Sequence, residues 1–168
     1  FVRKLANSNE IYYNQSVIQS EKDTCFRNAA LINLMRSFGN IKNDIYEVLE
    51  FYIFTCSVDM NVIELAQTFS FLANYGLEPI SQTRVIFSSK SKRINAVMQL
   101  CGFYDEAGEF SFKVGLPGKS GVGGGIVAIL PNKYSIAVWS PPLNEKGNSE
   151  RGLDFLEQFT TMTEESVF

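Results

Sequence analysis

Gly118-Lys119-Ser120-Gly121-Val122-Gly123-Gly124-Gly125-Ile126-Val127-Ala128-Ile129-Leu130 is the stretch of sequence that decides the fold. Its five apolar residues after a glycine cluster predict a buried strand. The next residues, Pro131-Asn132-Lys133, predict a turn, and the alternation across residues 134–139 predicts a second strand. We therefore expect an antiparallel hairpin. Because an isolated hairpin is marginally stable, it should lie beside further strands.

The residues before the hairpin show mainly helical periodicity. The expected helices are one that starts within residues 20–24 and stops before Gly39, one capped by Asn43 or Asp44 that runs to Cys56, and the segments 61–74, 89–100 and 149–161. Several helices, a hairpin and a terminal helix together predict an α+β fold, a helical cluster with antiparallel strands. The uncapped start, residues 1–5, suggests that the chain begins inside a larger domain.

The composition excludes several function classes. The chain has 168 residues, 45% of them hydrophobic, and a net charge of -3 without a basic run, which argues against a nucleic-acid partner. No stretch reaches the roughly 18 apolar residues of a membrane span. Histidine is absent, and the three cysteines are widely spaced, so we expect no metal or cofactor, and reduced, buried thiols of a cytoplasmic protein.

Two motifs compete for the glycine-rich stretch. Gly118-Lys119-Ser120 ends like a phosphate-binding P-loop, but that motif requires a glycine at the position of Lys113 and a helix after it. The better match is a Lys-Ser-Gly triplet on a strand edge, as in penicillin-binding proteins and class A β-lactamases. On these residues alone, a glycine-rich turn into a hairpin is the favoured interpretation, because three residues often match a motif by chance.

Segments along almost the whole chain, taken together, resemble the serine-dependent glutaminase family. They are Ser20-Glu21-Lys22 with Arg27-Asn28, Glu47-Val48-Leu49-Glu50-Phe51-Tyr52 with Cys56-Ser57-Val58, Leu72-Ala73-Asn74, Cys101-Gly102-Phe103-Tyr104-Asp105 with Gly108-Glu109-Phe110, Val114-Gly115-Leu116-Pro117, Lys119-Ser120-Gly121-Val122-Gly123-Gly124, and Trp139-Ser140-Pro141-Pro142-Leu143 with Gly147-Asn148-Ser149. The departures are mild: Cys25-Phe26 replace a common Gly-Asp, and Tyr75 replaces a common glycine.

The resemblance implies a β-lactamase-like fold and hydrolysis of L-glutamine to L-glutamate and ammonia through a serine acyl-enzyme. In the family, the serine of a Ser-x-x-Lys motif attacks the side-chain amide and the lysine acts as base. The only such spacing here, Ser89 to Lys92, falls on a polar, surface-like stretch. We therefore expect residues 1–168 to be the C-terminal part of a single glutaminase catalytic domain, without the nucleophile and inactive alone.

The resemblance assigns substrate-binding roles to residues of the first half. Glu21 is expected to bind the α-amino group of glutamine, although a carboxylate near a helix start can also serve the helix dipole. Asn28 is expected to hydrogen-bond the substrate; the alternative is a helix-start residue whose side chain bonds the backbone. Tyr52 is expected to contact substrate and relay a proton to the leaving ammonia; the alternative is that it only packs in the core.

Further roles fall on the second half. Tyr104 is expected to contact substrate from a loop, against a half-buried loop aromatic. Ser120 is expected to line the catalytic site, and Lys119 to support the strand. Val122 is expected to contribute its backbone N–H to the oxyanion hole.

Two other functions stay open at this point. The chain could be a non-catalytic binding or interaction module derived from a glutaminase, or could act on β-lactams, although Glu21 and Asn28 favour a free amino acid. The resemblance also implies self-association of the whole protein as a dimer or tetramer.

Overall fold

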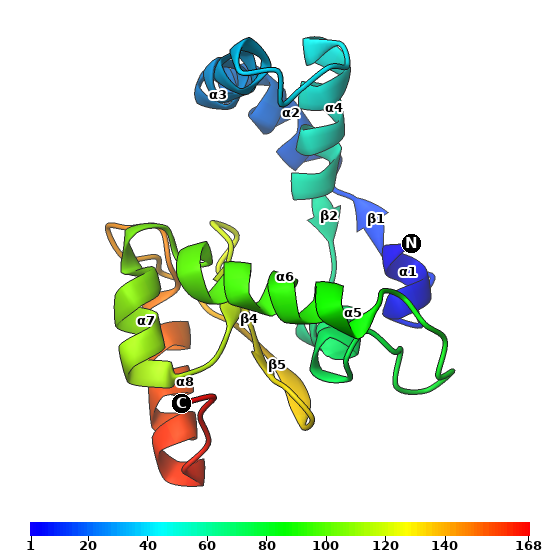
Figure 1. Cartoon of the computed structure of the whole chain (residues 1–168). Coiled ribbons are helices and arrows are strands. Elements are labelled where there is room, and N and C mark those ends of the chain that lie inside the picture. The colour runs from blue at the N-terminus through cyan, green and yellow to red at the C-terminus, as the bar shows by residue number, and fades with distance from the viewer. The chain divides into compact units, whose positions relative to one another are not determined.

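The computed structural model describes residues 1–168 (Figure 1). The chain forms two compact units. The sheet unit comprises residues 1–9 and 61–168, and the helical unit comprises residues 10–60. The sheet unit contains α1 (Val2–Leu5), α5 (Val62–Ala73), α6 (Ser88–Cys101), the 3-10 helix η1 (Tyr104–Glu106), α7 (Ala107–Val114), β3 (Gly118–Ser120), β4 (Gly125–Leu130), β5 (Tyr134–Trp139) and α8 (Glu150–Thr163). The helical unit contains β1 (Tyr12–Tyr13), α2 (Gln15–Thr24), α3 (Phe26–Ser37), α4 (Ile45–Cys56) and β2 (Val58–Asp59).

The predicted hairpin is confirmed as β4 and β5, which pair antiparallel from Gly125 opposite Trp139 to Leu130 opposite Tyr134. A third strand, β3, pairs antiparallel with the other edge of β4 and completes the order β3-β4-β5. The Lys-Ser segment thus supplies one further strand beside the hairpin; that additional strands lie upstream of the chain stays a prediction. With helices and an antiparallel sheet in one chain, the α+β class is confirmed.

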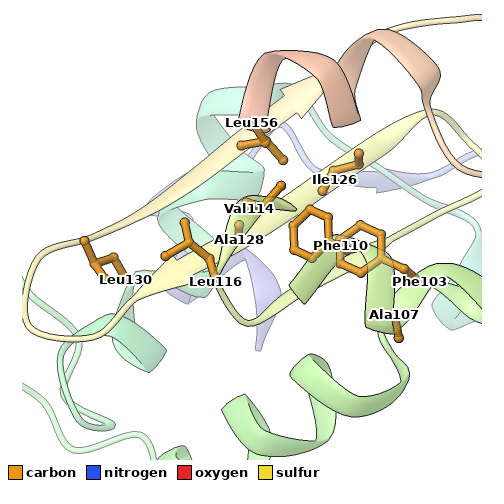
Figure 2. Packing of buried hydrophobic residues seen from close by; sticks show 9 residues of the cluster. All are labelled: Phe103, Ala107, Phe110, Val114, Leu116, Ile126, Ala128, Leu130 and Leu156. Atoms are coloured by element: carbon orange, nitrogen blue, oxygen red, sulfur yellow. The ribbon is translucent and has the colours of Figure 1, made fainter. Parts of the chain in front are cut away.

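The core of the sheet unit lies on both faces of β4, all of whose residues after Gly125 are buried. Alternate side chains of a strand point to opposite faces. Ile126, Ala128 and Leu130 pack with residues of α7 and α8, and Val127 and Ile129 pack with residues of α5 and α6. Figure 2 shows the first of these clusters, in which the ring of Phe103 stacks on that of Phe110 at 3.6 Å between centroids. Helices therefore cover both faces of the sheet.

Four of the eight α-helices, α2, α4, α5 and α8, begin at a residue whose side chain caps them. Asp44 and Asn61 accept hydrogen bonds from the first backbone N–H groups of α4 and α5, and Ser149 does the same for α8. At the other end of α3, Gly39 follows the C-cap with φ of 75°, as a helix stop requires. The boundaries expected at Asp44, Asn61, Ser149 and Gly39 are confirmed.

The expected start of the first helix within residues 20–24 is wrong. Those residues form the second half of α2, which starts after Asn14, whose side-chain oxygen accepts from the N–H groups of Ser16 and Val17 at 3.1 and 3.2 Å. All five of these polar residues except the half-buried Glu21 are exposed on the surface of α2. α2 ends at Thr24, and α3 begins one residue after Cys25.

The cysteines also differ from expectation. All three are free, but Cys56 and Cys101 are exposed at the last turns of α4 and α6, and Cys25 is half-buried. No helix combines the length and apolar character that crossing a membrane requires.

Glu64 joins α1 to α5 within the sheet unit. Ser8 Oγ donates to Glu64 Oε1 at 2.5 Å, and the backbone N–H of Asn61 donates to Glu64 Oε2 at 2.9 Å in a capping box. The Ser8 hydroxyl first, and the Asn61 N–H second, hold the pKa of Glu64 below its ordinary value of 4.5. Because the carboxylate is favoured in the folded state, its contribution to stability is present above about pH 4.5 and lost as the pH falls through the folded pKa.

We expect Ser8→Ala to raise the pKa of Glu64 toward 4.5 and so to reduce the loss of stability between pH 7 and the acid range. Denaturant unfolding of the full-length protein at several pH values measures this loss. Ser70→Ala on α5 is the control, because the Ser70 hydroxyl donates to a backbone carbonyl that does not titrate. Equal acid sensitivity in both variants would contradict the prediction.

Candidate active site

The Lys-Ser-Gly triplet lies at the end of the edge strand β3, as its motif predicts. The Ser120 N–H donates to Gly102 O at 3.0 Å, so the outer edge of β3 is tied to the segment that follows α6. Lys119 Nζ lies 4.9 Å from the centroid of the Tyr104 ring, within the range of a cation–π contact. The end of β3 and the first residues after α6 therefore form one local surface.

Tyr104 opens η1 with a left-handed backbone, φ of 53°, which is uncommon for a residue with a side chain. Its side chain is 47% exposed. A methyl group placed on Gly147 would lie 3.7 Å from Tyr104 Cε2 and 3.7 Å from Val122 Cγ1. Gly147 is therefore next to both side chains, and the structure brings Tyr104 and Val122 together from segments 18 positions apart in the sequence.

Val122 sits in the turn between β3 and β4. Gly121 N–H donates to Gly125 O, and Gly124 N–H donates to Gly121 O, both at 2.9 Å, so Val122 is a central residue of a tight turn. The N–H groups of central turn residues are not used by the turn itself. The Val122 N–H has no acceptor within the chain, and its side chain is 66% exposed. A donor of this kind is able to receive an anionic oxygen of a ligand.

Ser120 is buried, and its hydroxyl is within hydrogen-bond distance of two acceptors, Asn148 Oδ1 at 2.5 Å and Gly102 O at 3.3 Å. A hydroxyl has one proton to donate, so it bonds chiefly to the closer oxygen of Asn148. In this arrangement Ser120 holds two segments of the site together. Its expected role in lining the substrate site stays a prediction.

The helical unit carries the other expected residues on three helices: Glu21 on α2, Asn28 in the first turn of α3, and Tyr52 on α4. Both α2 and α3 pack against α4. The side chains of Glu21 and Asn28 are half-buried and make no hydrogen bond or ion pair within the chain, whereas Tyr52 is 43% exposed. An acid and an amide without protein partners are suited to bind a polar ligand.

Two hollows of the sheet unit are lined by none of the expected site residues. A groove of about 690 Å³ is lined by α7 and the residues at the end of the chain, and a smaller one of about 170 Å³ lies between α7 and α8. No cluster of histidine, cysteine and carboxylate side chains is arranged to hold a metal ion.

Sequence reasoning did not single out two residues that contact this surface, Glu106 and Asn148. Asn148 is fully buried, and its side chain bonds Ser120, the Phe103 carbonyl and Glu106. The only signal in the sequence was the segment Gly147-Asn148-Ser149, which carried the family resemblance without a role for its members.

The family model described as glutaminase matches residues 1–168. A glutaminase of Christiangramia forsetii is 54% identical over all 168 residues, and one of Saccharophagus degradans is 53% identical, and in each case the chain covers 55% of the relative. The chain thus spans about half the length of the curated relatives it matches.

Solved structures give the same result. A probable glutaminase superposes on 99% of this chain with a TM-score of 0.92 at 38% identity, over 54% of its own length. A Bacillus subtilis glutaminase, in covalent complex with 5-oxo-L-norleucine formed by reaction with 6-diazo-5-oxo-L-norleucine, superposes on 99% of the chain with a TM-score of 0.93 at 30% identity, over 59% of its length.

Proposed function

This chain belongs to the glutaminase family, with its β-lactamase-like fold, and from that premise we propose that the whole protein hydrolyses L-glutamine to L-glutamate and ammonia. The observation that carries the proposal is the match of the family over every residue of the chain. The covalent complex of the Bacillus subtilis relative supports a nucleophilic mechanism, because 5-oxo-L-norleucine has a ketone where glutamine has its side-chain amide.

The reaction runs in two halves. A serine hydroxyl attacks the side-chain carbonyl of glutamine, its proton passes to a lysine, and the carbonyl oxygen becomes an oxyanion that accepts a hydrogen bond from the Val122 N–H. The C–N bond then breaks as the nitrogen takes a proton through the Tyr52 hydroxyl and leaves as ammonia. Water attacks the acyl-serine and releases glutamate. The unused N–H of Val122 supports its part in this scheme.

The nucleophile is proposed to lie outside residues 1–168. The single Ser-x-x-Lys spacing in the chain, Ser89 to Lys92, lies in the first half of α6 with both side chains exposed. An exposed helical serine lacks the water-excluded surroundings in which a lysine becomes a base. Residues 1–168 are therefore proposed to supply substrate-binding and oxyanion-stabilising groups.

The substrate's polar ends define the remaining roles. The Glu21 carboxylate is proposed to bind the α-ammonium group of glutamine, and Asn28 and Tyr104 to bind its other polar groups. The support is the family resemblance at these positions, together with the absence of protein partners for the Glu21 and Asn28 side chains. Both units of the chain are accordingly proposed to belong to one C-terminal part of a glutaminase catalytic domain in a cytoplasmic homo-oligomer.

The decisive experiment measures ammonia release from L-glutamine. The full-length protein is expected to release ammonia, whereas residues 1–168 alone are expected to release none, and neither should hydrolyse a chromogenic β-lactam. Absence of glutamine turnover by the full-length protein would favour the binding-module alternative. Turnover by residues 1–168 alone would show that the nucleophile lies within them.

Glu21→Gln tests the substrate-binding role. The amide keeps the shape of the side chain but removes the charge that pairs with the α-ammonium, so KM for glutamine is expected to rise by about 10- to 100-fold, in keeping with a charged hydrogen bond. Steady-state ammonia release measures this effect. Glu47→Gln, at an exposed position in the first turn of α4, is the matched control and should leave KM unchanged. Equal effects of the two variants would contradict the role of Glu21.

A further inference from the structure

A polar network links the segments that carry Tyr104 and Val122; its members Ser120 and Asn148 are buried, and Glu106 and Asn144 are half-buried. Its centre is Glu106, whose two carboxylate oxygens accept from Asn144 Nδ2, each at 3.0 Å, and one of which also accepts from Asn148 Nδ2. Asn148 Nδ2 further donates to Phe103 O at 3.2 Å, and Asn148 Oδ1 accepts from Ser120 Oγ at 2.5 Å. Every polar atom of the Asn148 side chain is thereby used.

The network holds the chain on both sides of Tyr104. Asn148 Nδ2 donates to the carbonyl of Phe103, the residue before Tyr104. Glu106 is the second residue after Tyr104. The Glu106 N–H also donates to Phe103 O at 2.9 Å, which closes η1. A left-handed conformation such as that of Tyr104 costs energy and persists where surrounding bonds determine it.

The same network reaches Val122 by two routes. Ser120, bonded to Asn148, lies two residues before Val122 at the end of β3. Asn144 Oδ1 accepts from the N–H groups of Lys146 and Asn148 at 3.0 Å, which shapes the loop so that Gly147 lies next to both Tyr104 and Val122. The buried amide of Asn148 and the carboxylate of Glu106 thus connect Tyr104 with the turn that carries the Val122 N–H.

We propose that Asn148 and Glu106 are positioning residues that set the relative placement of the Tyr104 side chain and the Val122 N–H, and thereby determine kcat. This inference rests on the proposed glutamine hydrolysis. Reacting groups tolerate little displacement, and a shift of about 1 Å can lower the rate by about 10²-fold. Neither residue needs to touch the substrate to have this effect, because both act through Tyr104, Ser120 and the turn after it.

The orientation of the donors and acceptors gives a sharp test. In Asn148→Asp the group that donates to Glu106 becomes an acceptor, so two carboxylates face each other at the centre of the network. We expect kcat for glutamine to fall by about 10- to 100-fold in the full-length protein. Combining Asn148→Asp with Glu106→Gln restores one donor and one acceptor between the two side chains but not the bond to Phe103 O, and is expected to recover part of the loss, at least about threefold in kcat.

Asp105→Asn is the control. It removes an exposed ion pair, Lys146 Nζ to Asp105 Oδ2 at 3.3 Å, which joins the η1 segment to the same loop that carries Asn148. It should leave kcat unchanged. Thermal unfolding of each variant separates loss of folded protein from loss of turnover, since a merely structural role would lower Tm and leave kcat per folded molecule unchanged.

The outcomes distinguish the inference from the function on which it rests. An unmutated protein without glutamine turnover would overturn both. An active unmutated protein whose Asn148→Asp variant keeps kcat within about twofold, or is not rescued by Glu106→Gln, would overturn the positioning role alone.

Discussion

Tyr52→Phe is expected to lower kcat for glutamine by about 10²- to 10⁴-fold with little change in KM, the range typical of a lost general acid. The variant removes one oxygen and keeps the ring, so packing of α4 is preserved. The chain contains no histidine, so its own residues offer no imidazole that could deliver the proton to the departing nitrogen. A phenol that relays a proton from a lysine is the chemical substitute that the family resemblance assigns to Tyr52.

Tyr46→Phe provides the matched control, because Tyr46 lies on the same helix and is 81% exposed. It should leave kcat unchanged. A second substrate, γ-glutamyl-p-nitroanilide, extends the test. Its leaving group is weakly basic and needs less protonation, so Tyr52→Phe should lower kcat by a smaller factor with this anilide than with glutamine. A loss below threefold with glutamine, or equal losses with both substrates, would exclude the relay.

Much of the fold was predictable because local chemistry determines it. Five apolar residues after a glycine cluster formed β4, and Asp44, Asn61 and Ser149 started the helices that their capping oxygens favour. The start of α2 was missed, because the polar residues 20–24 suit an exposed helix face as well as a cap, and only the bonds of Asn14 show where the helix begins. Strand β3 was indicated only by the Lys-Ser-Gly motif, since its three residues carry too short a pattern to show a period.

The candidate site was predictable to the extent that it depends on residue type within a motif. Lys119 and Ser120 lie on a strand edge and Val122 in a turn, as the triplet suggested. The hydrogen bond of Ser120 to Asn148 was not predictable, because a contact between residues 28 positions apart leaves no local periodic signal. The residues proposed here to position the site fall in that non-local class.

The largest expected effect on stability is that of Gly102→Ala. A Cβ atom at Gly102 would lie 1.8 Å from Gly118 O and 2.4 Å from Met98 O, both backbone atoms that no side-chain rotation can move aside. Its φ of −76° is open to any residue, so the requirement for glycine is the close approach of two backbone segments. We expect the free energy of unfolding to fall by about 3 kcal/mol or more, at the upper end of overpacking effects.

Denaturant unfolding of the full-length protein measures the effect, with Gly108→Ala as the control. Gly108 lies within α7 with nothing within 4 Å of an added methyl group, so that variant should be stabilised by about 0.5–1 kcal/mol. A Gly102→Ala variant as stable as the unmutated protein would show that α6 and β3 do not meet as closely as these distances require. Because Gly102 O accepts from the Ser120 N–H, any folded fraction that survives should also have a displaced β3 edge, and glutamine turnover per folded molecule should fall with it. Gly102 therefore matters for both stability and the site. The close approach of its backbone to Gly118 places Tyr104, two residues later, next to Lys119.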